Sequence, residues 1–249
     1  MRKYLNKKTV FILAICFVIV AGSVAGFAIW QTRGRVQVEF NIHINPKSIY
    51  LSTYSEPPQL AIWLENPKNG QCQQVFVTYR VSRGDWEGKA DVPALPRWKA
   101  IFRSGGAQNV RSDEEIAISG ATPKDEYFRV RAEVPPGSEW ICWIEMNLAG
   151  DYNEYYPQFN PVTKVEDEFA IGQPSLLYRA AIKAEANLKY VPELAFMSLW
   201  NATDGNRLAP VDETITTAQN VLDEISIVII KPKPVIIKKN WLKRQEVLK

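Results

Sequence analysis

Side chains suited to acid–base or metal chemistry are sparse in this chain of 249 residues. His43 is its single histidine, so a histidine-dependent triad or a zinc site built on several histidines lacks its ligands. Acidic residues cluster at 113–115, 125–126 and 166–168, but no cluster has the spacing of an EF-hand calcium loop. We interpret the clusters as solvated loop charges and predict neither a catalytic nor a metal site.

The segment Ser119-Gly120-Ala121-Thr122 has the sharpest chemical interpretation. It resembles the core of the motif by which exported redox proteins accept flavin mononucleotide through a phosphoester on the last hydroxyl, here Thr122. Gly120 permits a tight backbone at this point. The fuller motif has an Asp three residues before the first hydroxyl, where this chain has Ile116. A plain turn before Pro123 is the preferred interpretation, and covalent flavin at Thr122 is the alternative.

Aromatic residues provide a second set of candidate positions. The chain has eight tryptophans, and an exposed row of Trp or Tyr on a sheet stacks against sugars or partner proteins. Trp143 is predicted on the sheet face opposite Trp140, because side chains alternate between the faces of a strand. Core packing is the competing interpretation. The candidates for partner or sugar binding are Trp86, Trp98, Trp143, Tyr152 and Tyr155.

The chain has three cysteines, of which Cys16 lies in an uncharged segment near the amino terminus and Cys72 and Cys142 lie in the remainder. If that remainder is exported from the cytoplasm, a disulfide between Cys72 and Cys142 can form. The apolar phase around them differs, because even-numbered positions are apolar around Cys142 and odd-numbered ones around Cys72. The two side chains therefore point to different sheet faces unless a bulge resets the register. The sequence leaves a disulfide and two separate thiols open.

Alternation of apolar and polar residues dominates the chain after Arg35. In 36–44 every even residue is apolar and every odd one polar, which is typical of a half-buried strand. Further strands are predicted at 59–65, 71–81, 128–134, 139–148, 175–185, 193–200 and 225–230. The residues predicted on inner sheet faces are Val38, Phe40, Val77, Tyr79, Val130 and Ala132. Short alternating strands separated by turns predict a mainly β fold, an antiparallel β-sandwich.

The order of these features resembles a known family over residues 36–157. The segment 59–65, a Gly-bearing hairpin, Leu95-Pro96-Arg97-Trp98, 118–123 and the strand 140–148 follow one another as in bacterial predicted periplasmic proteins known as a domain of unknown function. The resemblance implies an immunoglobulin-like β-sandwich and a link to extracytoplasmic flavin-dependent electron transfer. Because that family has no assigned activity, it implies no catalytic residues.

The start of the chain predicts a membrane anchor. Residues 9–32 contain no charged side chain, and a helix rising about 1.5 Å per residue over this run covers the roughly 30 Å hydrocarbon core of a bilayer. Four basic residues within 1–8 precede it, so the positive-inside rule keeps the amino terminus in the cytoplasm and exports 36–230. A cleaved signal peptide is the alternative, because Ser23-Val24-Ala25 resembles a cleavage site.

Charge is unevenly distributed along the chain. Residues 36–230 hold 17 lysines and arginines against 26 aspartates and glutamates, a net charge of −9, whereas 231–249 has a net charge of +6. An acidic body argues against nucleic acid as a partner. The basic tail is expected to reach anionic lipid headgroups at about 1 kcal/mol per basic residue, and a solvated extension is the alternative.

These features together predict a single-pass protein of the cytoplasmic membrane whose folded domain lies outside, in the periplasm or the extracellular space. The domain is one β-sandwich region over 36–230, or two parts divided near 160, between the anchor and the basic tail. We expect it to bind or scaffold envelope or membrane proteins rather than to catalyse a reaction, and to need no cofactor. The alternatives are a redox accessory protein with flavin at Thr122 and a carbohydrate-binding module.

Overall fold

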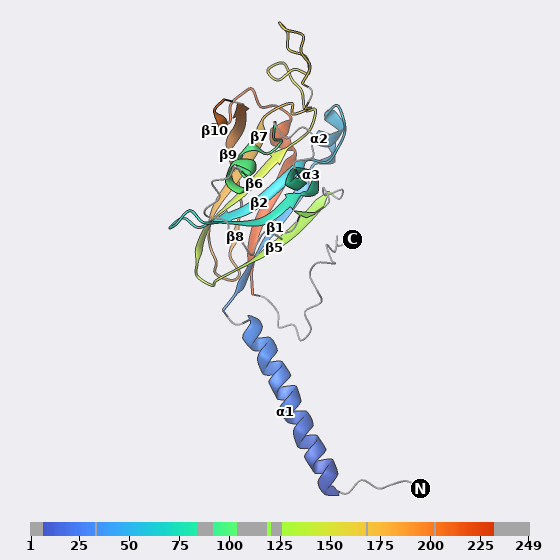
Figure 1. Ribbon diagram of the computed structural model, residues 1–249, viewed down its shortest axis with the longest axis vertical. Coiled ribbons are helices and arrows are strands. Elements are labelled where there is room, and N and C mark those ends of the chain that lie inside the picture. The colour runs from blue at the N-terminus through green and yellow to red at the C-terminus, as the bar shows by residue number, and fades with distance from the viewer. Residues whose placement is uncertain are drawn as a thin grey trace, which may run out of the picture.

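The alternating segments form two β-sheets in the computed structural model, which describes residues 7–32, 34–83, 92–103, 119–120, 126–167, 169–201 and 203–231 (Figure 1). The smaller sheet has the strand order β5-β1-β11-β8, which are Tyr127–Val134, Val36–Ile44, Leu222–Ile230 and Lys189–Tyr190. The larger sheet has the order β10-β9-β7-β6-β2-β3-β4, which are Gly205–Ala209, Glu193–Asn201, Ser175–Lys183, Glu139–Asn147, Gln59–Glu65, Cys72–Thr78 and Ser119–Gly120. Neighbouring strands are antiparallel, except that β3 and β4 are parallel.

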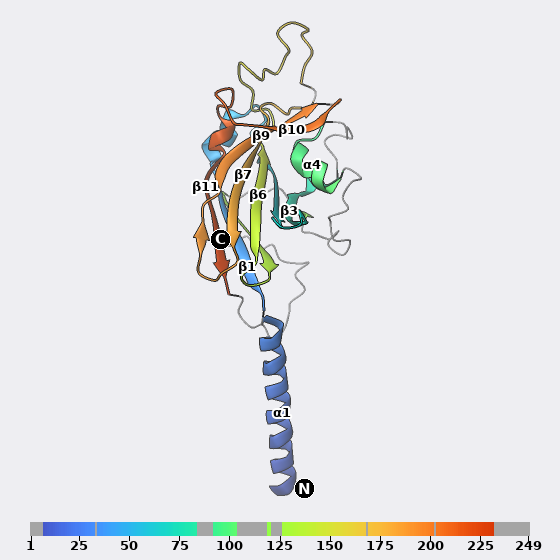
Figure 2. The same cartoon turned by 90° about the vertical axis from the view of Figure 1, so that its left-hand side faces the viewer.

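Helix α1, Lys7–Thr32, precedes β1 and extends away from the sheets (Figures 1 and 2). Within the described part of the chain, no helix is long and apolar enough to cross a membrane. The shorter helices are α2 Pro46–Leu51, α3 Tyr79–Arg83, α4 Pro96–Phe102 and the 3-10 helix η2 Ala218–Asn220.

The main apolar core lies between the two sheets, an arrangement compatible with a β-sandwich. Val38, Phe40 and Ile42 of β1 are fully buried there, because every second side chain of a strand points to the same face. The larger sheet contributes further buried side chains to the same cluster, among them Leu60, Ile62, Leu64, Ile144, Met146 and Leu176. The prediction of a mainly β protein is therefore confirmed.

A second apolar cluster covers the outer face of the larger sheet. It contains Ala61, Trp63, Cys72, Val77, Leu95, Trp98 and Leu177. Helix α4 supplies Trp98 and lies beside this sheet near β3 and β10 (Figure 2). Because the sheet is covered on both faces, Leu60–Leu64 of β2 are all buried rather than alternating.

One predicted strand is shorter than expected. The strand 71–81 ends at Thr78, and helix α3 begins at Tyr79. The Thr78 side chain is buried and donates to Gln59 Oε1 at 2.8 Å, whereas Tyr79 is 45% exposed. The predicted burial of Tyr79 is therefore wrong. Val38, Phe40, Val130 and Ala132 are buried in the core between the sheets, as predicted. Val77 is buried as well, but on the outer face of the larger sheet, so the predicted face is wrong for this residue.

Residues before and after position 160 contribute to the same two sheets. Strand β7 pairs with β6 in the larger sheet, and β11 pairs with β1 in the smaller one. Gln37 stands opposite Ile230 in that second pairing. The last described strand thus ends beside the start of β1, at the side of the sandwich from which α1 extends (Figure 1).

Candidate functional site

The connection between β6 and β7 projects from the end of the sandwich opposite α1 (Figure 1). We call residues 154–167 of this connection the distal loop. It exposes large apolar side chains, with exposed fractions of 51% at Tyr155, 51% at Phe159, 86% at Val162 and 61% at Val165. Of the predicted binding residues, Tyr155 belongs to this loop, while Tyr152 precedes it and is half-buried.

Hydrogen bonds within the distal loop define its shape. The side chain of Asn160 accepts from the backbone N–H groups of Val162 and Thr163, each at 2.9 Å. The backbone N–H of Asn160 donates to the Val165 carbonyl at 2.8 Å. Asn160 is thus the turn residue of a small hairpin, because an Asn side chain can replace a backbone acceptor in a turn.

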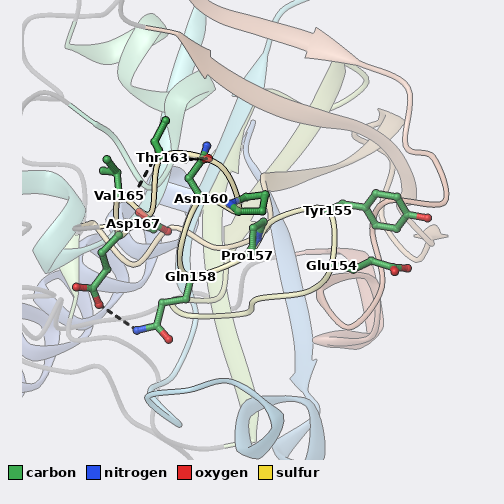
Figure 3. Close-up of a pocket in the computed structure, with 10 residues that line it drawn as sticks. Glu154, Tyr155, Pro157, Gln158, Asn160, Thr163, Val165 and Asp167 are labelled. Atoms are coloured by element: carbon green, nitrogen blue, oxygen red, sulfur yellow. Dashed lines mark hydrogen bonds between the residues drawn. The ribbon is translucent and has the colours of Figure 1, made fainter.

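The distal loop surrounds an open hollow of about 570 Å³ (Figure 3). Gln158 Nε2 donates to Glu166 Oε1 at 3.0 Å and links its two sides. The lining residues include three carboxylates and no basic side chain: Glu154, Tyr155, Pro157, Gln158, Asn160, Pro161, Thr163, Val165, Glu166 and Asp167. The hollow is therefore acidic and partly apolar.

The base of the loop is fastened to the segment before η2. Asn153 Nδ2 donates to the Thr214 carbonyl at 2.8 Å and to Thr216 Oγ1 at 3.1 Å. Gln173, 1% exposed, accepts from the Thr216 N–H at 2.7 Å and donates to Thr217 Oγ1 at 2.9 Å. These bonds connect both ends of the loop to one neighbouring segment.

Asp151 and Gly172 complete this base. Asp151 is buried and accepts from Thr217 Oγ1, and burial raises the pKa of its carboxyl while the bonds from Thr217 and Gln173 lower it. Gly172 has φ +63°, and a Cβ there would lie 2.8 Å from the backbone N and O of Asp151. Only glycine fits at this crossing of two backbone segments.

Trp143 lies in a row of side chains across the outer face of the larger sheet. Trp63, Trp143 and Arg179 stand opposite one another on β2, β6 and β7. The Trp63 and Trp143 ring centroids are 6.2 Å apart at 17°, and the Arg179 guanidinium lies 5.7 Å from the Trp143 ring centroid. The Trp143 ring thus has an aromatic neighbour on one side of β6 and a basic neighbour on the other, and it is half-buried between them.

Trp98 is 2% exposed, and its indole N–H donates to Gln74 Oε1 at 2.9 Å. Trp98 therefore offers no free ring face on which a sugar would stack, whereas Trp143 is half-buried and stays a predicted binding residue. Trp86 lies outside the described residues, as does Thr122. Flavin attachment at Thr122 therefore stays the alternative to a plain turn before Pro123.

Glu145 is a residue that sequence reasoning missed. Its odd position on β6 places it on the outer face, where an acidic side chain is expected in water, yet it is 0% exposed because α4 covers it. Its neighbours across the sheet are Ala61 and Leu177. These apolar residues on the outer face are the signal in the sequence that this face is covered.

The Glu145 carboxylate caps helix α4 from another element. Oε1 accepts from the backbone N–H of Arg97 at 3.0 Å and from Ser175 Oγ at 2.8 Å, and Oε2 accepts from the Trp98 N–H at 2.7 Å. Leu95, the N-cap residue, makes no side-chain cap, so Glu145 satisfies two of the free N–H groups at this helix start. Burial raises the pKa of Glu145 from 4.5 to about 7, although these bonds and the Arg97 charge lower it.

Cys72 and Cys142 are both free thiols in this structure. Cys72 belongs to the apolar cluster on the outer face and Cys142 to the core between the sheets. The disulfide left open by the sequence is therefore not formed, because the two side chains lie on opposite faces of one sheet. Burial raises the pKa of both thiols, that of Cys72 to about 11.

His43 lies on the outer face of the smaller sheet. Its Nδ1 contacts Asp223, its Nε2 is 3.8 Å from Glu126, and its ring centroid is 4.5 Å from that of Tyr127. Across the described ranges of the chain, no three His, Cys, Asp or Glu side chains come together as a metal site would require. His43 thus contacts two carboxylates and a tyrosine ring of neighbouring elements.

The chain was compared with known proteins at three levels. No protein-family model, no curated protein and no solved structure matches it. The resemblance of residues 36–157 to predicted periplasmic proteins stays a prediction.

Proposed function

We propose that this chain is a membrane-anchored, extracytoplasmic binding or scaffolding module of the immunoglobulin-like kind, with the distal loop as its partner-binding surface. The observation that best supports this is the set of large apolar side chains that an internally bonded loop exposes: Tyr155, Phe159, Val162 and Val165. Apolar side chains gathered on an exposed loop are typical of protein-interaction sites.

The partner in this proposal is an envelope or membrane protein with an apolar groove rimmed by basic side chains. The hollow of the distal loop presents Glu154, Glu166 and Asp167, and complementary charges steer a partner and set its register. The uncharged run of residues 9–32 holds the module in the bilayer, with its amino terminus in the cytoplasm. The distal loop and α1 lie at opposite ends of the sandwich (Figure 1), so the contact forms away from the bilayer surface.

The bilayer is the second partner. The basic tail lies beyond the described residues from position 232 onward. It begins at Lys231, directly after Ile230, which stands opposite Gln37 near the end of α1. The net charge of +6 in 231–249 therefore starts on the membrane side of the domain, where anionic headgroups attract basic side chains.

Photo-cross-linking in native membranes tests the distal loop. A photoreactive amino acid at Val162, which is 86% exposed, is expected to yield one discrete cross-linked product. The same amino acid at Lys68, an exposed residue of the β2–β3 turn, is the matched control and is expected to yield none.

The change Phe159→Asp is made in the chain that carries the cross-linker at position 162. It tests whether the cross-link reports a specific apolar contact or only random encounters with neighbouring proteins. Phe159 is half exposed, so the sandwich retains its circular dichroism spectrum while the apolar contact is lost. We expect the cross-linked product to disappear in Phe159→Asp. In the chain without this change, the product is expected to weaken at high salt, because the charge contacts are screened. Equal products from Val162 and Lys68, or a product unaffected by Phe159→Asp, would contradict the proposal.

A further inference from the structure

We propose that Glu145 is a proton-controlled latch that holds α4 on the outer face of the larger sheet, and that α4 is released as the pH rises. The latch consists of the two backbone N–H groups of Arg97 and Trp98 on one Glu145 carboxylate. The remaining attachment includes a hydrogen bond from the Trp98 indole N–H to Gln74 Oε1 and apolar packing, in which Leu95 and Trp98 are buried against the sheet with Phe102 beside them. Of these polar links between the helix and the sheet, the Glu145 cap is the one that contains a titratable group.

Glu145 is accommodated in the docked state when it carries a proton. Ser175 Oγ lies 2.8 Å from Oε1, and a hydroxyl can donate to a carboxylate or accept from a carboxylic acid. The neutral acid therefore keeps both backbone bonds and reverses only the bond to Ser175. The ionised form has no exposed surface, so it loses its hydration.

Few charges compensate the ionised form. On α4 the charge that acts on Glu145 is that of Arg97, and the polar group on β7 is Ser175. The neighbours on β2 and β7 in the same row are Ala61 and Leu177, and Phe196 of β9 follows next to Leu177. The environment therefore favours the neutral acid.

The direction of the effect follows from proton linkage. Burial raises the pKa of Glu145 from 4.5 to about 7 in the docked state, whereas a released carboxyl in water has its ordinary pKa near 4.5. The docked state therefore binds the proton more tightly, and the docking equilibrium weakens by up to about tenfold per pH unit between these values. Release uncovers an apolar surface that includes Ala61, Trp63, Val77 and Leu177.

Thiol labelling of the full chain in detergent micelles tests the latch. Cys72 lies in the cluster that α4 covers, and Cys142 lies between the sheets. The experiment uses a chain with the change Cys16→Ser. At each pH, the labelling rate of Cys72 in the folded chain is divided by its rate in the urea-unfolded chain, which removes the pH dependence of the thiol reaction itself. We expect this ratio to rise by up to about tenfold per pH unit between pH 4.5 and 7, while Cys142 stays unlabelled.

The change Glu145→Gln is expected to abolish the pH dependence, because an amide does not titrate in this range. If this variant fails to fold, which labelling of its Cys142 would report, Ser175→Ala provides the second measurement. That change removes a hydrogen bond that lowers the pKa of Glu145, so the rise should extend to higher pH. The latch would be overturned if the Cys72 labelling ratio of the unmodified chain does not change with pH, or if Cys142 is labelled as fast as Cys72. It would also be overturned if Glu145→Gln keeps the same pH dependence or if Ser175→Ala does not shift it.

Discussion

Gly172 is a residue at which the backbone itself excludes any side chain. Its φ of +63° lies in the left-handed region, and the backbone of Asp151 occupies the space that a side chain would need. Gly70 has a similar φ of +67°, but nothing lies within 4 Å of its missing Cβ. A side chain at Gly70 would therefore meet only the strain of the left-handed backbone conformation, whereas one at Gly172 would also clash with the backbone.

We expect Gly172→Ala to destabilise the domain more than Gly70→Ala. The second change costs about 1 kcal/mol, because it adds only left-handed strain. The first adds a clash with the backbone and costs on the order of 3 kcal/mol or more in total. Denaturant unfolding of both variants measures the difference, and equal midpoints would show that the base of the distal loop adapts.

Residues whose environment comes from a distant segment were the hardest to predict. Glu145 stands at a polar position of an alternating strand, and its burial comes from α4, which is far from it in sequence. Trp98 was predicted as a candidate for stacking and is buried by the same contact. Periodicity reports which face of a strand a side chain occupies, but not what covers that face.

Alternation is most informative for elements that have water on one side. Strand β1 has the bounds predicted from the sequence, Val36–Ile44, because the apolar residues of its inner face alternate strictly with polar residues on its outer face. Strand β10, Gly205–Ala209, was missed, because its sequence Gly-Asn-Arg-Leu-Ala has no period-two pattern. From the sequence alone, residues 93–98 favour a loop with at most one helical turn. Helix α4 nevertheless extends over Pro96–Phe102, because its position depends on Glu145 and on the apolar cluster beneath it.

Two neighbouring residues of β1 test the assignment of its faces. Phe40 is fully buried in the core between the sheets, so Phe40→Ala is expected to cost about 3–5 kcal/mol through lost burial and a residual cavity. Asn41 on the outer face accepts from Arg129 Nε at 2.8 Å, and Asn41→Ala is expected to cost about 1 kcal/mol. Similar losses in denaturant unfolding experiments would contradict the assignment of faces.

For the whole molecule, the proposed topology predicts an asymmetric response to protease. In spheroplasts, added protease is expected to remove the domain that follows Arg35 and to spare an amino-terminal tag, because positive residues before 9–32 keep that end inside. Lysed cells are the control, in which the tag is also lost. Protection of the domain in intact spheroplasts, or a mature chain that begins near Gly26, would exclude the uncleaved anchor.

The tail predicts a dependence on lipid composition. If the net charge of +6 binds anionic headgroups as proposed, trypsin cleavage within 231–249 of the full chain in vesicles is expected to be slower when anionic lipid is present. High salt should remove this protection. Cleavage at Lys68, exposed in the β2–β3 turn, is the internal control, and equal tail cleavage in neutral and anionic vesicles would exclude the lipid contact.

The central position of β1 determines how the domain carries tension. This strand follows α1 directly and lies between β5 and β11, antiparallel to both. In the proposed topology, a pull between the bilayer and a partner on the distal loop would act along β1, whose ladder bonds run perpendicular to the strand. The hydrogen bonds of two strand pairs are therefore loaded together in shear, whereas a strand at the sheet edge can be separated one bond at a time. Pulling between residue 35 and the distal loop should therefore need a higher unfolding force than pulling perpendicular to the strands.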